Sequence, residues 1–363
     1  MHANPIAQSS TATIYFGTKD AILDAILDVL DGARRAVVRR AGRLGAIAEL
    51  RRHREARLTV VALVSIAAAF VAAVVATLPL LLLGPLLLGV PHVASDVRYL
   101  LIRRAAQGPA AAARAPMLAL LAASTVCAAL GSAAAAIAAA WAAVLCAGLF
   151  APSGRAARAA FSALVLAAAV LSLWRPAPAT VVLAQGHNLI AIALAAWMVR
   201  GKLRTFIPAA AFVAGAAAIA CGACDGWLLH AAAPSALAPT TFDDVRAAVV
   251  PAGIDPVHAC RWVALFAFAQ SVHYGAWLRI VPDAERASDR PTSFRRSFRL
   301  LSEDLGRRGA LIAIALSLAL PLGAFLSPEG ARRAYIQLSA FHGFIEIAFV
   351  ACLVLARFPR RLS

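Results

Sequence analysis

The chain has 363 residues, is 62% hydrophobic and has a mean hydropathy of +0.78. These values exclude an ordinary soluble domain and predict repeated spans of about 20 apolar residues. The formal net charge of +17 comes from arginines that cluster between the apolar segments, so it indicates membrane topology and contact with anionic lipid. No nucleic-acid recognition module accompanies the arginines, and we expect no nucleic-acid partner. The composition predicts an integral protein of a bacterial inner (plasma) membrane.

Residues 1–57 are expected to form a cytoplasmic, basic, amphipathic segment. Apolar residues recur at helical spacing from Ala21 to Leu30, and many arginines follow up to Arg57. Two readings fit this pattern. The segment is either a helix that lies on the membrane surface or a solvated basic helix that only enforces topology. The first residues show no signal-peptide pattern.

Residues 58–357 are expected to form an all-α, polytopic transmembrane bundle of about ten helices. Turns are predicted at Pro79, at Gly131-Ser132 and at Pro328-Glu329-Gly330. Cationic loops recur after every even span, which places both termini in the cytoplasm. The expected spans are about 58–78, 79–102, two within 117–150, 159–174, 180–199, 206–221, 259–280, 310–326 and 335–356.

Two connections between these spans differ in charge. Residues 224–255 carry four aspartates with few cations and are expected to be a non-cytoplasmic loop, whereas residues 279–308 form a basic connector. Cys221 and Cys224 form a C-x-x-C at the edge of the acidic loop. Because no second pair completes a zinc set, they are expected to be an incidental pair or a disulfide.

Four histidines lie inside the apolar part of the chain, each on a different expected span: His92, His187, His273 and His342. Counted from the cytoplasmic ends at 1.5 Å per residue, they lie within roughly 10 to 23 Å of that face. Ionisable side chains at membrane depth usually face the bundle interior and serve a function. We therefore expect the four imidazoles to bind one metal ion, and the absence of thiolates in this layer argues against a structural zinc site.

Two of these histidines have a carboxylate one helical turn later. Asp96 follows His92, and Glu346 follows His342, each at i,i+4. Such a carboxylate can fix the tautomer of a metal-bound imidazole or ligate the metal directly. We assign Asp96 and Glu346 catalytic, ligand-orienting roles.

The other two histidines have polar neighbours. Gln185 and Asn188 flank His187, and Gln270 precedes His273. Tyr274 and Trp277 next to His273 are also consistent with interfacial anchors. His230 and His258 lie in or beside the acidic loop, too far along the chain to join the same layer, and are expected at the surface.

These motifs resemble the Brp/Blh family of membrane-bound central-cleavage β-carotene dioxygenases. The segment Gly89-Val90-Pro91-His92-Val93-Ala94-Ser95-Asp96 resembles that family's G-x-P-H-x-x-x-D, and the segment 341–346 resembles its closing H-x-x-x-D. Gly186-His187-Asn188 and Val272-His273-Tyr274 follow the order of its second and third histidine motifs. The resemblance implies an all-helical fold and histidine-bound iron that cleaves a polyene with oxygen.

The favoured hypothesis is a non-haem iron membrane oxygenase, and the resemblance implies the carotenoid-cleaving type that yields retinal. Its substrate would be a carotenoid or other isoprenoid lipid that enters sideways from the bilayer. The alternatives are an ion- or proton-coupled transporter that uses the same histidines and carboxylates, a b-haem protein with two axial histidines, and structural hydrogen bonding alone. The interruptions at Gly84-Pro85 and Gly89-Val90-Pro91 favour the transporter, but the sequence shows no matching interruption in the second half.

Overall fold

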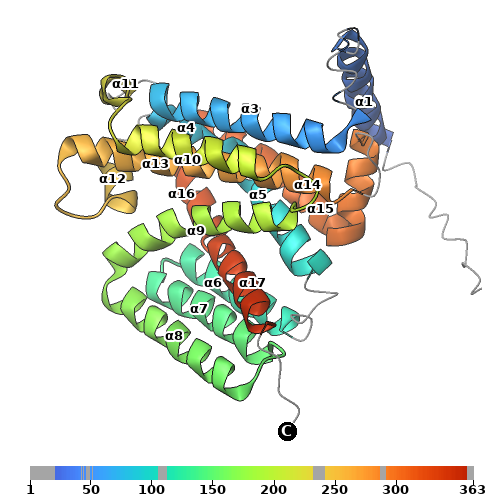
Figure 1. Ribbon diagram of the computed structural model, residues 1–363. Helices are drawn as coiled ribbons and strands as arrows, with labels where there is room; N and C mark the ends of the chain where they lie inside the picture. Colours follow the sequence, from blue (N-terminus) through green and yellow to red (C-terminus); the bar gives the residue numbers. More distant parts are fainter. Residues whose placement is uncertain are drawn as a thin grey trace, which may run out of the picture.

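The computed structural model describes residues 21–41, 52–104, 113–231, 242–286 and 292–357, together with Arg43, Gly45 and Leu50. These residues form helices and no strand, with one isolated bridge between Arg200 and Leu203. The expected all-α bundle is confirmed for this part of the chain (Figure 1).

The helices follow one another with short connections. The first half contains α1 (Ala21–Ala41), α3 (Arg54–Val75), α4 (Thr77–Gly84), η2 (Pro85–Gly89), α5 (Val90–Asp96), η3 (Val97–Arg104), α6 (Arg114–Ala129), α7 (Ala133–Phe150), α8 (Arg155–Trp174) and α9 (Pro176–Met198). The second half contains α10 (Phe206–Ala220), α11 (Asp225–Ala231), α12 (Phe242–Val249), α13 (Pro256–Gly275), η5 (Ala276–Ile280), α14 (Val281–Ala284), α15 (Phe294–Leu326), α16 (Pro328–Ser339) and α17 (His342–Leu355). The η segments are π-helical.

Within the described part of the chain, seven helices are long and apolar enough to cross a membrane, or eight if α10 and α11, which meet at a bend of 78°, count as one span. The membrane bundle is therefore supported, but not the count of ten. Of the remaining expected spans, α6 has only 16 residues, and α13 carries several polar side chains. The cytoplasmic placement of both termini stays a prediction. Two of the arginines that follow the last expected span, Arg360 and Arg361, lie outside the described residues.

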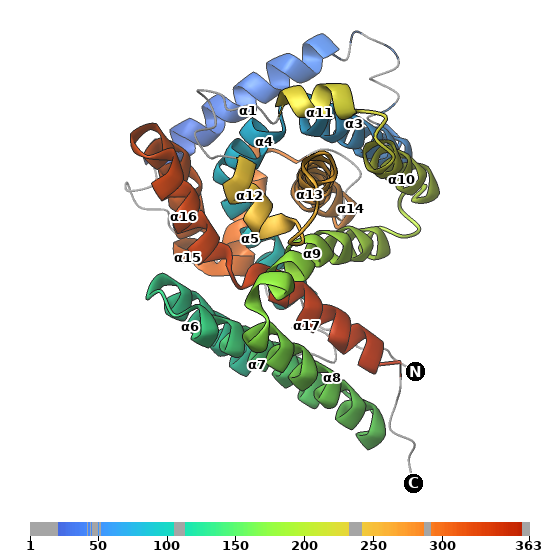
Figure 2. The ribbon, with the colours of Figure 1, turned by 90° about the vertical axis from the view of Figure 1, so that its left-hand side faces the viewer.

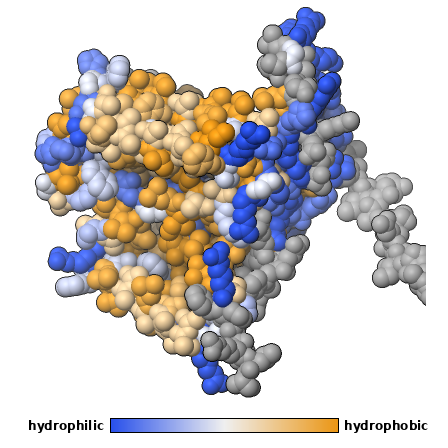
Figure 3. Space-filling view, viewed as in Figure 1, coloured by the Kyte–Doolittle hydropathy of each residue, from blue (hydrophilic) through white to orange (hydrophobic). Residues whose placement is uncertain are grey.

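Helix α13 lies at the centre of one half of the bundle, surrounded by α3, α4, α9, α10 and α12 (Figure 2). Because protein rather than lipid surrounds it, this helix can carry polar side chains. Its Arg261 pairs with Asp225 of α11 at 2.9 and 2.5 Å. On the face that Figure 3 shows, an apolar band lies between hydrophilic groups gathered at the α11–α12 end and at the α1 end.

The buried apolar residues form two cores. One includes Phe268 and Leu82, and the other includes Trp277 and Leu100. Three of the four intramembrane histidines fall in sequence between members of the two cores. His273, for example, lies between Val272 of the first and Ala276 of the second. The bundle thus holds a polar layer between two apolar ones.

Helix α1 packs against the N-terminal half of α15. The Asp31 carboxylate accepts hydrogen bonds from the backbone N–H groups of Phe294 (2.8 Å) and Arg295 (3.3 Å), which are unpaired donors at a helix start. Burial opposes ionisation of Asp31, but these two donors and the nearby Arg34 together outweigh it and lower the pKa of the carboxyl. Ile22 and Val29 remain 77% and 72% exposed, so an apolar face of α1 stays open, as either reading of this segment allows.

Two predicted turns are wrong. The chain breaks at Ala76 rather than Pro79, and at Ser327 rather than in Pro328-Glu329-Gly330. Both prolines instead lie in the first turn of the next helix, where a missing N–H costs no intrahelical hydrogen bond. The predicted turn at Gly131-Ser132 is confirmed, with Gly131 at φ 79°.

The acidic connection is not a simple loop. It contains α11 and α12, and α12 packs on α9 and α13. Cys221 and Cys224 are both free thiols, so the structure shows an incidental pair and no disulfide. The basic connector is also partly helical, because α15 begins at Phe294 and continues through a kink at Gly306.

Candidate metal centre

The four intramembrane histidines meet at one place. The ring centroids of His92 and His273 lie 4.3 Å apart. The other three neighbouring pairs, His92–His342, His187–His273 and His187–His342, lie 5.5, 5.5 and 5.1 Å apart. The rings come from α5, α9, α13 and α17, so the cluster joins residues that are up to 250 positions apart in the 363-residue chain.

Irregular helical segments lie next to three of the rings. His92 follows the π-helical segment η2, and η5 follows His273 after two residues. Single π-helical turns often mark functional sites because they shift the direction of the side chains that follow. His342 begins α17 directly after the break at Ala340 and Phe341 that ends α16. The second half of the chain therefore does contain an interruption, contrary to the prediction.

Backbone hydrogen bonds fix the tautomers of His187 and His342. The Nδ1 atom of His187 lies 2.9 Å from the carbonyl of Ala184, and that of His342 lies 2.5 Å from the carbonyl of Ser339. A carbonyl only accepts, so Nδ1–H is the donor and the Nε2 atom of each ring carries a lone pair. An imidazole in this state is a metal ligand.

A hydrogen bond to the side chain of Asn188 fixes the tautomer of His273. Its Oδ1 atom lies 2.9 Å from Nδ1 of His273, while its Nδ2 donates to the carbonyl of Ala184 at 3.1 Å. The second bond fixes which end of the amide faces the ring, so Asn188 accepts from Nδ1–H and leaves the lone pair on Nε2. The only signal of this contact in the sequence is a polar residue beside a histidine in an apolar helix.

Asn188→Ala is accordingly expected to weaken metal binding by about 10- to 100-fold, the usual loss when a partner that orients a metal-bound histidine is removed. Titration of metal-stripped protein with Fe(II) measures the affinity. Asn188→Asp, which keeps the acceptor, should retain most of it. Equal affinity in wild type and Asn188→Ala would show that this contact is only structural.

Both carboxylates of the cluster face an imidazole nitrogen. Oδ2 of Asp96 lies 3.1 Å from Nε2 of His92, and Oε1 of Glu346 lies 3.2 Å from Nε2 of His273. Neither contact has the geometry of a hydrogen bond, and among the described residues these carboxylates and Nε2 atoms have no hydrogen-bond partner. One ligand atom each from His92, Asp96 and His273 lies within 4.8 Å of the others.

These buried atoms fit a cation between them. His92, Asp96, His273 and Glu346 are all 0% exposed, and an unpaired buried carboxylate is too costly to remain charged. Two ligands bound at about 2.0–2.2 Å to one metal ion lie about 3 Å apart when they are neighbours in the coordination sphere. The observed separations of 3.1 and 3.2 Å match this value. The donor set therefore fits a transition metal that prefers nitrogen and oxygen ligands.

The cluster is more open on one side. His187 and His342 are partly exposed, in contrast to the fully buried His92 and His273. Gly343 lies against His187, where an added Cβ would be 3.2 Å from the Cβ of His187. Helices α9 and α17 therefore approach closely beside the two more accessible rings.

Two expectations about neighbouring residues are wrong. The structure pairs Glu346 with His273 of another helix instead of His342 one turn away, because the packing of α17 beside α9 and α5 brings its carboxylate to the ring on α13. Tyr274 and Trp277 are 3% and 0% exposed, so they are core residues and not interfacial anchors. The amide of Gln185 donates to the carbonyl of Val249 at 3.1 Å.

A pair of tyrosine hydroxyls lies beside the cluster. The Tyr274 ring is 4.9 Å from that of His92, and its hydroxyl is 3.2 Å from that of Tyr335. Tyr335 packs so closely on Gly89 that a Cβ there would overlap its ring.

Gly89→Ala should destabilise the protein by about 1–3 kcal/mol, the usual cost of overpacking, because Tyr335 must move and its hydrogen bond is lost. The melting temperature in detergent measures the effect. Gly186→Ala, where nothing lies within 4 Å of the added Cβ, is the matched control. A melting temperature for Gly89→Ala at or above that of this control would contradict the close contact.

His230 and His258 are surface residues, as expected. Both are exposed, and Nδ1 of His258 contacts Oδ2 of Asp255 at 2.6 Å. Neither belongs to the cluster.

Comparison with known proteins adds no relative. No family model matches the chain, and neither a curated protein nor a solved structure matches it. Functional inference therefore depends on the residues of the cluster and on the motifs that carry them.

Proposed function

We propose that this protein is a membrane oxygenase that holds a non-haem iron on His92, His187, His273 and His342 and acts on a carotenoid or another isoprenoid lipid. The observation that carries the proposal is the convergence of four imidazoles and two carboxylates. Among the described residues, both carboxylates and the Nε2 atoms of His92 and His273 lack hydrogen-bond partners. The resemblance of the four histidine motifs to the Brp/Blh family supports the choice of iron and substrate.

When bound, iron would supply the activation of dioxygen, which converts one polyene C=C bond into two aldehydes that take up both oxygen atoms. The chain's own residues prepare the site for this chemistry. Asn188 and the backbone carbonyls at 184 and 339 keep three of the four rings, those of His273, His187 and His342, in ligand-ready tautomers. Asp96 and Glu346 bring negative charge next to His92 and His273 and so offset the charge of a bound cation.

The position of the cluster within an apolar bundle suits a lipid-soluble substrate. A polyene in the bilayer can approach between helices without crossing water, and burial of the carboxylates keeps bulk water from the reacting bond. The more accessible side at His187 and His342 is the expected direction of approach.

The test is product formation by protein loaded anaerobically with Fe(II) and given β-carotene, a reductant and air. Loss of polyene absorbance with appearance of aldehydes is expected in wild type and in the surface variant His230→Ala, but not in His342→Ala. If the iron-loaded wild type leaves β-carotene and a set of shorter isoprenoids unchanged, the oxygenase proposal is wrong.

A proton- or ion-coupled transporter is the second candidate, and the helix interruptions favour it. The span that carries His92 contains η2, and the last span breaks just before His342; broken helices near the midplane are typical of transporter sites. A proton or ion flux in vesicles containing metal-free protein, abolished by Asp96→Asn, would support this candidate over the oxygenase.

A further inference from the structure

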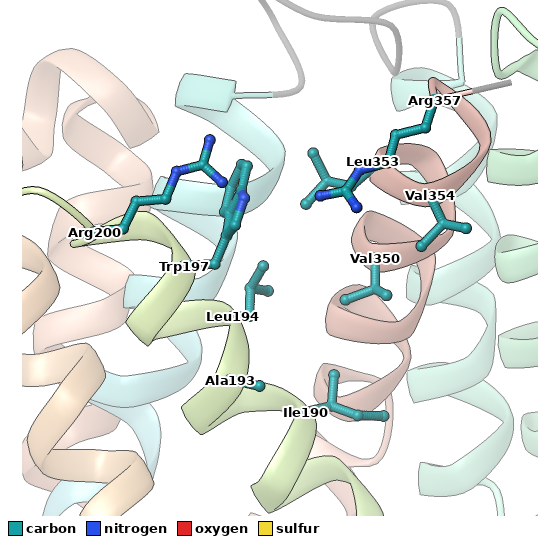
Figure 4. Close-up of a pocket in the computed structure, with 9 residues that line it drawn as sticks. All are labelled: Ile190, Ala193, Leu194, Trp197, Arg200, Val350, Leu353, Val354 and Arg357. Carbon is teal, nitrogen blue, oxygen red and sulfur yellow. The ribbon is translucent and has the colours of Figure 1, made fainter. Parts of the chain in front are cut away.

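A cavity of about 410 Å³ lies between α9 and α17, beside the histidine cluster but separate from it (Figure 4). The two helices are in close contact where Gly343 meets His187, and they separate towards their C-terminal ends, which opens the cavity. From Val350 to Arg357 it extends seven residues along α17 and the turn that follows, about 10 Å at a helical rise.

The cavity is apolar along its walls and cationic at one end. Ile190, Leu194 and Val350 contribute to the walls, and Arg200 and Arg357 lie at the end where the helices are furthest apart (Figure 4). None of the nine lining residues is acidic. The guanidinium of Arg200 lies over the Trp197 ring, 4.7 Å from its centroid, which holds it at the mouth of the cavity.

Arg200 and Arg357 differ from the neighbouring cations in their lack of an acidic partner among the described residues. Lys202 pairs with Glu285 at 3.4 Å, and Arg204 pairs with Glu55 at 2.9 Å. Among the described residues, by contrast, neither Arg200 nor Arg357 has an acidic partner, and both are exposed. Two unneutralised guanidinium groups at the end of an apolar cavity match an amphiphile with an anionic head, and arginine is the side chain best suited to a phosphate.

The narrow end of the cavity points to the cluster. His187 precedes Ile190 by three residues on the same helical face, about 4.5 Å along the axis, and Glu346 precedes Val350 by one turn. A chain bound along these walls would therefore end beside the more accessible rings of the cluster.

We propose that this cavity binds an anionic phospholipid, with its phosphate on Arg200 and Arg357 and one acyl chain along Ile190, Leu194 and Val350. This lipid site depends only on the cavity and its two arginines. The proposal therefore does not require that the histidines bind metal.

The experiment compares phosphatidylglycerol with phosphatidylcholine of the same chains, titrated into the detergent-purified full chain and counted by native mass spectrometry. Wild type should prefer phosphatidylglycerol by about tenfold or more, which is about 1.4 kcal/mol. The double variant Arg200→Gln/Arg357→Gln should lose this preference. Arg175→Gln is the matched control, because Arg175 also lies over a tryptophan ring, Trp174, at 5.1 Å but does not line the cavity.

A second variant locates the acyl chain. Ala193 lines the cavity and is exposed, so Ala193→Trp should fill the cavity and prevent lipid binding without disturbing the core. Metal content, measured on the same samples, should be unchanged in both variants, which separates this proposal from that of the metal centre. Equal binding of the two lipids by wild type, or a preference that survives either variant, would overturn the lipid site.

Discussion

Protein carrying His342→Ala or His273→Ala is expected to purify with less than about a tenth of the wild-type metal. Removing a residue that ligates the metal should lower the metal affinity by more than the 10- to 100-fold that is usual when a residue hydrogen-bonded to a ligand is removed. In His273→Ala, Glu346 and Asn188 also lose the ring that they contact. Elemental analysis of the detergent-purified protein gives the metal per chain.

His230→Ala is the matched control for both variants, because it removes an exposed imidazole outside the cluster. It should keep the wild-type metal content. His342 lies at the partly exposed edge of the cluster, so its variant tests the ligand role even if loss of the buried His273 prevents folding. Wild-type metal content in both folded variants would show that these rings are not ligands.

The largest expected loss of stability comes from Arg57→Leu. Arg57 and Asp283 form a buried pair, with Nε–Oδ2 and Nη2–Oδ1 distances of 3.0 and 3.3 Å and side chains only 6% and 2% exposed. Removing one partner of such a pair leaves a buried charge and typically costs about 3–5 kcal/mol. Arg286, at 3.2 Å from Asp283, compensates in part, so the lower end of this range is expected.

Unfolding by a denaturing detergent, followed by circular dichroism, measures the loss. Arg204→Leu breaks an exposed pair with Glu55 and should change stability little. The double variant Arg57→Leu/Asp283→Leu should recover part of the loss, because the buried charge is gone as well. If Arg57→Leu is as stable as Arg204→Leu, the pair does not hold α3 to α14.

The helical periodicity was sufficient to predict some of the cluster. Asp96 lies one turn after His92 on the same helix, so their contact depends only on the helical repeat. Glu346 was paired with the wrong histidine because its contact with His273 depends on how two helices dock, and local spacing does not contain that information. Asn188 reaches His273 by the same kind of contact between helices, across 85 positions of the chain.

The errors in the fold have similar causes. Proline is compatible both with a turn between helices and with the first residues of a helix. The local sequence therefore allowed either position for Pro79 and Pro328. Helix α13 carries Arg261 and His273 because other helices surround it, and hydropathy alone does not distinguish such a central helix from one that faces lipid. The turn at Gly131, in contrast, was predictable because its positive φ favours glycine.

X-ray absorption at the metal edge of the purified wild-type protein shows whether the histidine cluster binds iron. We predict bound iron with nitrogen and oxygen neighbours at about 2.0–2.2 Å, a multiple-scattering pattern from several imidazoles and no sulfur shell. His342→Ala should lose this spectrum, whereas His230→Ala should keep it. A wild-type protein that binds no metal under conditions that retain it, or one with a porphyrin or sulfur signature, would contradict the histidine and carboxylate centre.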